Sequence, residues 1–233
     1  MAEEVTLDAS AAVVRASRSV TDEPEPCCFD DWSGSYAKRA RSRRVGGVSS
    51  DLIRGLEAAG LSGRTVLDVG CGAGGLVLET LERGAEAATG VDLSTASIEE
   101  ARRIASERGL AARATFRVED GALASLEPHD VVVLDKVFCC YEDVDALLRN
   151  SLGAARSVYG FSVPPSAGLR GAFQRALAAA SNVWYRLRRS RFGSFRAYVH
   201  DVTALDAGVR AAGFEPLFSR RRFTWDLAVY RRA

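Results

Sequence analysis

Residues 66–75, VLDVGCGAGG, constrain the fold more than any other part of the chain. An apolar run typical of a buried strand leads directly into glycines, and a helical pattern follows over 74–83. The glycines of this stretch are Gly70, Gly72, Gly74 and Gly75. Glycine adopts backbone angles closed to other residues and lets a ligand approach the main chain. The stretch therefore predicts a strand–loop–helix unit whose loop is either a ligand cradle or a tight turn.

Strand and helix patterns alternate along the remaining chain. The expected strands are 64–69, 87–92, 114–120, 130–135 and 157–163, with closing strands at 214–220 and 223–232. The expected helices are 51–59, 74–83, 94–109, 143–156 and 201–213. Ser50 or Asp51 would cap the first of these, and Ser94 or Thr95 the third. Repeated alternation predicts an α/β fold, a doubly wound parallel sheet with helices on both faces.

Acidic residues follow the ends of the expected strands, where ligands bind in such sheets. Asp92 ends the second strand about 20 residues beyond the loop, where a carboxylate accepts the hydroxyls of a ribose. Asp120 ends the third strand, where it would reach the edge of an adenine. Asp68 lies just before the glycines and suits a positively charged ligand better than a pyrophosphate. The glycine spacing also satisfies G-x-G-x-x-G, so a nicotinamide-dependent oxidoreductase is an alternative.

Four motifs in order resemble those of class I S-adenosylmethionine-dependent methyltransferases: VLDVGCGAGG (66–75), TGVDLS (89–94), VEDGA (118–122) and DVVVLDKVFCCY (130–141). The resemblance covers roughly residues 50–163 and implies a Rossmann-like seven-stranded sheet whose last strand is antiparallel. It also implies S-adenosylmethionine as cofactor, with its ribose at Asp92, its adenine at Asp120 and its methionine at the glycine loop. The candidate cofactor residues are Asp68, Gly70, Cys71, Gly72, Gly74, Asp92, Leu93, Asp120, Gly121 and Asp135.

Within that class, the layout is most similar to the magnesium-protoporphyrin O-methyltransferases. The shared features are the W-x-x-x-Y of Trp32 and Tyr36, an insertion after FSVPP, and YVH at 198–200. A histidine of those enzymes is replaced here by Cys140, before Tyr141, which puts a porphyrin acceptor in doubt. Tyr36 and Tyr141 are the candidate catalytic residues.

Three segments are candidates for the acceptor pocket: a lid at 27–50, the exit of the fourth strand at 134–141, and a helical insertion at 166–200. The arginines and aromatic rings of the insertion would suit a bulky anionic, partly planar small-molecule acceptor, with O-methylation favoured. The same insertion could instead be a solvated basic face or a patch that touches membrane or RNA. The alternatives to a small-molecule methyltransferase are a non-catalytic module of the same fold and an RNA methyltransferase.

The 233 residues are enough for one domain, expected over 27–233 after a mobile tail at 1–26. The formal net charge of +1 argues against DNA as a partner, and RNA is not expected either. No stretch is long and apolar enough to span a membrane, and the acidic N-terminus is unlike a signal peptide. A cytoplasmic protein with reduced thiols and no metal site is expected.

Overall fold

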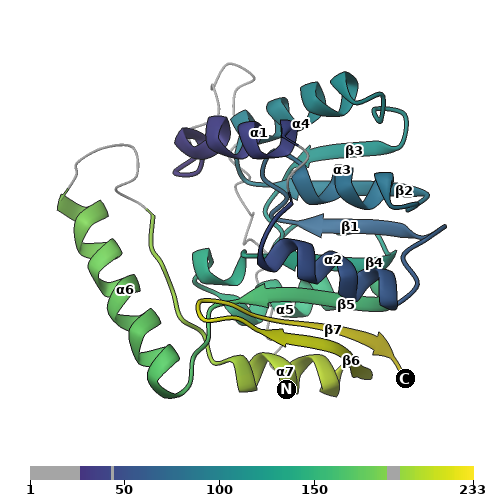
Figure 1. The fold of residues 1–233 in the computed structure, drawn as a ribbon. Coiled ribbons are helices and arrows are strands. Elements are labelled where there is room, and N and C mark those ends of the chain that lie inside the picture. Colours follow the sequence, from purple (N-terminus) through teal and green to yellow (C-terminus); the bar gives the residue numbers. More distant parts are fainter. Residues whose placement is uncertain (1–26, 43–44, 188–194) are drawn as a thin grey trace, which may run out of the picture.

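A seven-stranded sheet forms the centre of the computed structural model, which describes residues 27–42, 45–187 and 195–233. The strand order is β3-β2-β1-β4-β5-β7-β6 (Figure 1). The strands are β1 (Thr65–Val69), β2 (Ala87–Asp92), β3 (Ala114–Val118), β4 (His129–Asp135), β5 (Ala155–Val163), β6 (Phe214–Arg221) and β7 (Asp226–Arg232). The expected mobile tail at 1–26 lies outside the described residues, as does 188–194 of the insertion.

Only β7 runs antiparallel to its neighbours, β5 and β6, so the expected fold class with an antiparallel last strand is confirmed. Strand β1 pairs in parallel with both β2 and β4. The chain therefore winds outward in one direction from β1 to β3 and in the other from β4 onward. The carboxyl ends of β1 and β4 flank the point where the order reverses, which is where α/β sheets bind ligands.

Helices cover both faces of the sheet, and one helix stands apart from it (Figure 1). The core beneath α1 (Ser33–Arg41), α2 (Val48–Ala58), α3 (Gly75–Glu82) and α4 (Thr95–Glu107) lies on one face. The core beneath α5 (Val144–Gly153) and α7 (Val202–Ala211) lies on the other. Two short 3-10 helices occupy Asp30–Trp32 and Phe138–Cys140. The separate helix is α6 (Gly168–Leu187). In the described residues, no helix combines the length and apolar character needed to cross a membrane.

Polar capping residues mark the starts of some helices, as the sequence predicts. The side chain of Ser94 accepts a hydrogen bond from the amide of Ser97 at 3.0 Å, which confirms Ser94 as the cap of α4. The expected start of the first long helix at 51 was wrong, because α2 begins at Val48 after Gly47. Gly47 has a φ of 62°, a conformation that glycine adopts at no steric cost, and the chain thus enters the helix one turn earlier.

Asp51 therefore lies inside the helix, and its fully buried side chain joins α2 to the C-terminal hairpin. Its carboxylate accepts hydrogen bonds from Arg222 Nε at 2.5 Å and Arg220 Nη1 at 2.9 Å. Arg54, one turn along α2, donates to the same carboxylate at 3.0 Å. The hydrogen bond from Arg222, with the charges of all three arginines, lowers the pKa of Asp51 despite its burial.

Replacing Asp51 with Asn should lower the free energy of unfolding by about 2 kcal/mol, because buried charge-assisted hydrogen bonds are lost. Because the folded-state pKa is lowered, this stabilisation is present above the ordinary pKa of 3.8 and is lost as the pH falls through the folded value. Urea unfolding at pH 7 and at pH 3 measures both effects. Asp145→Asn, on the exposed side of α5, is the control and should change stability by less than about 0.5 kcal/mol. An equal loss in both variants at pH 7 would show that the arginine cluster contributes nothing specific.

Candidate functional site

A cavity of about 610 Å³ opens at the carboxyl ends of β1, β2 and β4. Ten of the twelve residues predicted for cofactor binding or catalysis line it, from segments far apart in the sequence. They are Tyr36, Asp68, Gly70, Cys71, Gly72, Asp92, Leu93, Gly121, Asp135 and Tyr141. The structure thus brings together one side of helix α1, the glycine loop and the ends of three strands.

The glycine loop is held by the neighbouring strand β2. The amide of Gly70 donates to the carbonyl of Val91 at 2.8 Å, and the amide of Gly72 donates to Oδ2 of Asp92 at 2.8 Å. Gly70 has a φ of 78°, and a Cβ there would lie 2.5 Å from the side chain of Val137. A side chain at this position would therefore strain the backbone and displace the exit of β4.

Two predicted residues do not line the cavity. Gly74 is the N-cap of α3 with a φ of 75°, and a Cβ there would lie 2.8 Å from the ring of Phe116, so its space is taken by packing. Strand β3 ends at Val118, two residues earlier than expected, and the carboxylate of Asp120 accepts a hydrogen bond from the Tyr141 hydroxyl at 2.7 Å. Its neighbour Glu119 lines the cavity instead.

Asp68 is the most unusual group in the cavity. Its side chain is only 2% exposed, and Oδ1 has no hydrogen-bond partner among the described residues. Burial raises the pKa of Asp68 well above its usual value, and the nearby carboxylates of Asp135 and Asp92 raise it further. A buried, unpartnered carboxylate is costly, and a cationic ligand in the cavity would remove that cost.

Unlike Asp68, Asp92 has its carboxylate engaged in hydrogen bonds within the protein. Its carboxylate accepts from the amide of Gly72 and, at 2.9 Å, from the amide of Ser94. Burial raises the pKa of Asp92, and these two amide hydrogen bonds act in the opposite direction. The side chain thus connects the loop after β1 to the start of α4 while one edge of it lines the cavity.

The exit of β4 carries a polar cluster that the sequence patterns did not reveal. Asp135 accepts hydrogen bonds from Ser49 Oγ at 2.5 Å and from Ser162 Oγ at 2.6 Å, and Nζ of Lys136 lies 3.3 Å from it. Ser49 comes from α2 and Ser162 from β5, 86 and 27 residues away, so no local motif links them. The carboxylate of Asp135 is thus already satisfied by protein donors.

Lys136 shows backbone strain at this cluster. Its φ of 64° is the one left-handed value at a non-glycine position among the described residues. Its ammonium donates to Ser49 Oγ at 2.5 Å, and its side chain lines the cavity. Strained backbone of this kind is tolerated where surrounding contacts over-determine it, and it concentrates at functional sites.

Helix α1 places Tyr36 next to the glycine loop. A Cβ at Gly72 would lie 3.6 Å from the Tyr36 ring, so a larger residue there would press against the ring. Burial, followed by the nearby thiol of Cys140, raises the pKa of Tyr36, and its phenol therefore stays protonated at neutral pH. Tyr141 behaves alike: burial and its hydrogen bond to Asp120 raise its pKa.

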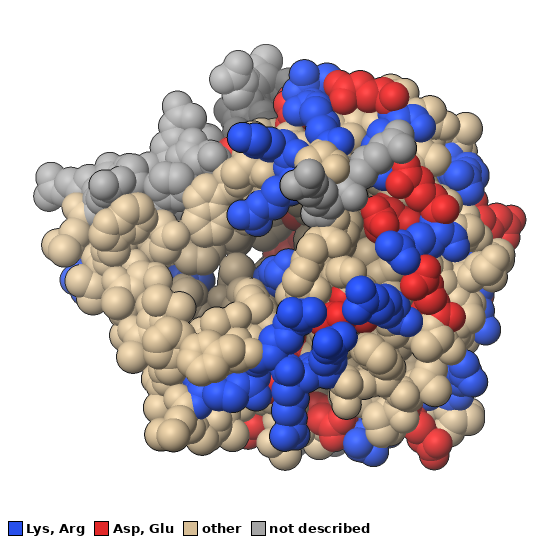
Figure 2. All heavy atoms as spheres, viewed as in Figure 1, with Lys and Arg blue, Asp and Glu red and all other residues tan. Residues whose placement is uncertain are grey.

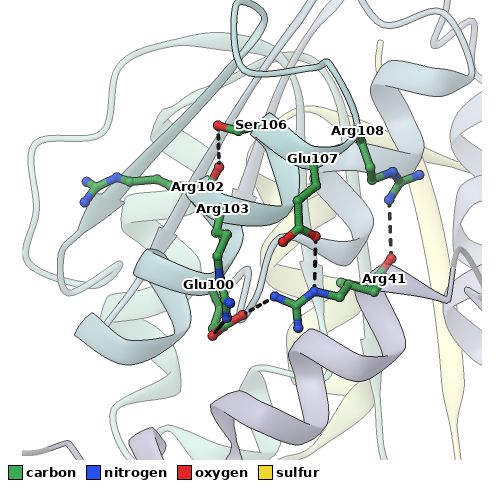
Figure 3. A network of polar contacts seen from close by, with 8 residues as sticks. Arg41, Glu100, Arg102, Arg103, Ser106, Glu107 and Arg108 are labelled. Atoms are coloured by element: carbon green, nitrogen blue, oxygen red, sulfur yellow. Dashed lines mark hydrogen bonds and ion pairs between the residues drawn. The ribbon is translucent and has the colours of Figure 1, made fainter.

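Charged contacts dock α1 on α4 (Figure 3). Arg41, at the end of α1, donates to Glu100 at 2.7 Å and to Glu107 at 3.1 Å. Arg108, beyond α4, donates to the carbonyl of Ala40 at 3.5 Å. These contacts set the position of α1 and, through it, the position of Tyr36 above the loop.

Residues 61–165 match a family model described as a methyltransferase domain. The chain is 40% identical over 124 residues to the ubiquinone biosynthesis O-methyltransferase of Neisseria meningitidis serogroup C, covering 52% of this chain and 50% of that protein. It is 48% identical over 54 residues to the enzyme of the same description from Actinobacillus pleuropneumoniae serotype 5b, covering 23% of each. The chain thus aligns with half or less of the length of these relatives.

Among solved structures, the fold is similar to magnesium protoporphyrin IX methyltransferase from Synechocystis PCC 6803 with bound S-adenosylhomocysteine (SAH). The TM-score is 0.62 at 21% identity, over 88% of this chain and 97% of that one. Residues 61–165 thus match a methyltransferase domain, and the sheet order and glycine loop agree with the Rossmann-like fold of the Synechocystis enzyme.

Asp68→Asn should stabilise the unliganded protein at pH 7 by about 1 kcal/mol, a rise of roughly 2–4 °C in Tm, because a desolvated charge is removed. A raised carboxyl pKa makes the folded state lose stability as the pH rises above 3.8, so the gain should be larger at pH 8 than at pH 5. Thermal melts at both pH values measure it. A variant less stable than the wild type at pH 8 would contradict this interpretation of Asp68.

Proposed function

We propose that the chain is an S-adenosylmethionine-dependent methyltransferase that acts on a small-molecule acceptor, with oxygen as the favoured atom. The observation that carries the proposal is the buried Asp68 side chain, which lines the cavity together with the glycine loop and has one carboxylate oxygen without a hydrogen-bond partner among the described residues. The O-methyltransferases among the relatives support the choice of oxygen. The location in the cytoplasm stays a prediction.

The residues of the cavity fit this cofactor. Asp68 would accept the ammonium of the methionine part, and its unpartnered Oδ1 is the observation that favours a cationic group there. Asp92 would hold the ribose, and the segment of Glu119 to Gly121 would meet the adenine. A pyrophosphate would instead face the carboxylates of Asp68 and Asp92, which weighs against a nicotinamide cofactor.

When bound, S-adenosylmethionine supplies an electrophilic methyl group attached to a positively charged sulfur. The chain's own residues would orient the acceptor oxygen and exclude water. Tyr36, which stays protonated, would donate a hydrogen bond to that oxygen rather than remove a proton from it. An acceptor that is already anionic, such as a carboxylate, needs no base, and Lys136 and Arg39 supply positive charge at the same cavity.

The lining therefore supports an anionic acceptor with a planar part. The cations at the cavity lie beside aromatic rings, those of Phe29 and Tyr36, which hold flat groups. Magnesium protoporphyrin IX, for which the structurally similar Synechocystis enzyme is named, meets this description. Cys140 lines the cavity at the position where the magnesium-protoporphyrin O-methyltransferases carry a histidine. Smaller aromatic carboxylates are therefore equally good candidates for the acceptor.

Calorimetry with SAH tests the cofactor. Asp68→Asn should weaken SAH binding at least about tenfold, because a hydrogen bond between charged groups contributes roughly 1.5–3 kcal/mol. Asp145→Asn should leave the affinity unchanged, and NADH should not bind. Binding of NADH in place of SAH, or no binding of either by a folded protein, would overturn the proposal.

Tyr36→Phe tests the role of the lid. It should lower the rate of methyl transfer about tenfold, the effect of one lost hydrogen bond, while the SAH affinity changes less than twofold. SAH release is followed with magnesium protoporphyrin IX, a benzoate and a catechol as separate acceptors. Tyr198→Phe, outside the cavity, is the matched control. Tight SAH binding without transfer to any of the acceptors would favour the non-catalytic module, and turnover only with an RNA substrate would favour the RNA methyltransferase.

A further inference from the structure

Helix α6 exposes an apolar stripe on the side turned away from the sheet. Six of the eleven large hydrophobic side chains that are exposed in the described residues lie on this one helix: Leu169, Phe173, Leu177, Val183, Trp184 and Leu187. Leu169 is 92% exposed and Leu187 is 76% exposed. A patch of this extent on one element marks an interaction surface rather than the scattered apolar residues of an ordinary surface.

The spacing of these residues places them along one face of the helix. Leu169, Phe173 and Leu177 follow each other at intervals of four, and Trp184 and Leu187 continue the same face two turns later. In Figure 2 the outer side of α6, at the left, is mainly uncharged, and basic atoms gather where the helix meets the body. Phe223, from the turn between β6 and β7, extends the stripe through a ring contact of 5.5 Å with Phe173.

The opposite face of α6 is already held by the protein. Gln174 donates to the carbonyl of Thr224 at 2.8 Å, and Asn182 exchanges hydrogen bonds with the backbone of Ala197 at 3.0 and 2.7 Å. The ring of Tyr185 lies 4.9 Å from that of Phe195. With its inner face fixed in this way, the helix has no means of rotating its apolar stripe toward the core.

Charge distinguishes between the kinds of partner that the stripe would fit. Residues 164–200 contain seven arginines and no aspartate or glutamate, although the whole chain has a net charge of +1. Arg186 is exposed in the last turn of α6, whereas Arg170 is paired with Asp226 at 2.6 Å. An apolar stripe within a strongly basic, acid-free segment is the pattern of helices that lie in the interface of anionic lipid membranes.

We propose that α6 docks lengthwise on the surface of an anionic lipid bilayer. The stripe enters the boundary between headgroups and acyl chains, and the exposed Arg186 contacts a lipid phosphate. The helix does not span the membrane; it lies along it, over a length of about 30 Å for its 20 residues.

Docking there would place the lid beside the membrane. The ring of Trp32 lies 6.1 Å from Tyr185 of α6 and 6.4 Å from Tyr36, which lines the cavity. Aromatic contacts thus run from the inner face of α6 to the site. A partly apolar acceptor dissolved in the bilayer would have a short path to the cavity.

Vesicle co-sedimentation of the full chain tests the proposal, with phosphatidylcholine alone and with phosphatidylcholine containing phosphatidylglycerol. We expect binding to the anionic vesicles that weakens at high salt. The double variant Leu169→Gln/Leu177→Gln should reduce the partition coefficient at least about tenfold. The double variant Leu123→Gln/Leu217→Gln changes leucines of similar exposure outside α6 and should have less than a twofold effect.

A second pair of variants tests the charge. Arg186→Gln should weaken binding to anionic vesicles about fivefold, the contribution of one arginine near an anionic surface, and Arg149→Gln, on the exposed side of α5, should not. Circular dichroism and SAH affinity, unchanged in all variants, verify that each is folded.

Three results would overturn membrane docking. The first is the absence of wild-type binding to anionic vesicles, or equal losses in the variant and control pairs. The second is salt-dependent binding of RNA, weakened by Arg186→Gln, by a protein that does not bind vesicles. This result would assign the surface to RNA. The third is a solution mass of two copies that Leu169→Gln/Leu177→Gln reduces to one, which would make the stripe an interface between copies.

Discussion

The buried carboxylate of Asp68 is the constraint on which the site depends. It lies at the end of β1, between β2 and β4, so the pairing of the central strands removes it from water. Its desolvation is uncompensated in the protein alone, because Oδ1 has no partner among the described residues. The sheet thus holds a carboxyl group whose burial cost is relieved by protonation or by a bound cation, as expected where stability is exchanged for function.

The surroundings of Asp68 are built so that the cavity stays open. Asp92 ties the glycine loop to β2, and Val137 leaves no room for a side chain at Gly70. Arg41 holds α1 against α4, and this position of α1 brings Tyr36 next to the glycine loop. The Asp51 cluster joins α2 to the C-terminal hairpin, and α2 in turn supplies Ser49 to the polar cluster of Asp135. The site is therefore positioned by contacts that connect both ends of the described chain.

Sequence patterns succeeded where the determinants are local. The strand ends at Val69, Asp92 and Asp135 were predictable because apolar runs stop there, and Ser94 was recognisable as a cap from its own side chain. They failed where residues from distant segments determine what a side chain contacts. The Asp120 carboxylate turns to Tyr141, 21 residues away, and Asp51 pairs with Arg222, 171 residues away, so no local pattern contains either contact.

The sequence by itself determined the class of fold, the glycine loop and the order of the acids along the strand ends, since these follow from periodicity and backbone freedom within a few residues. Only the tertiary structure decided which acid is left without a partner, that Lys136 adopts a left-handed backbone beside Ser49, and that α6 turns its apolar face outward. Burial and pairing depend on what the rest of the chain places around a residue, and that information is absent from any local stretch.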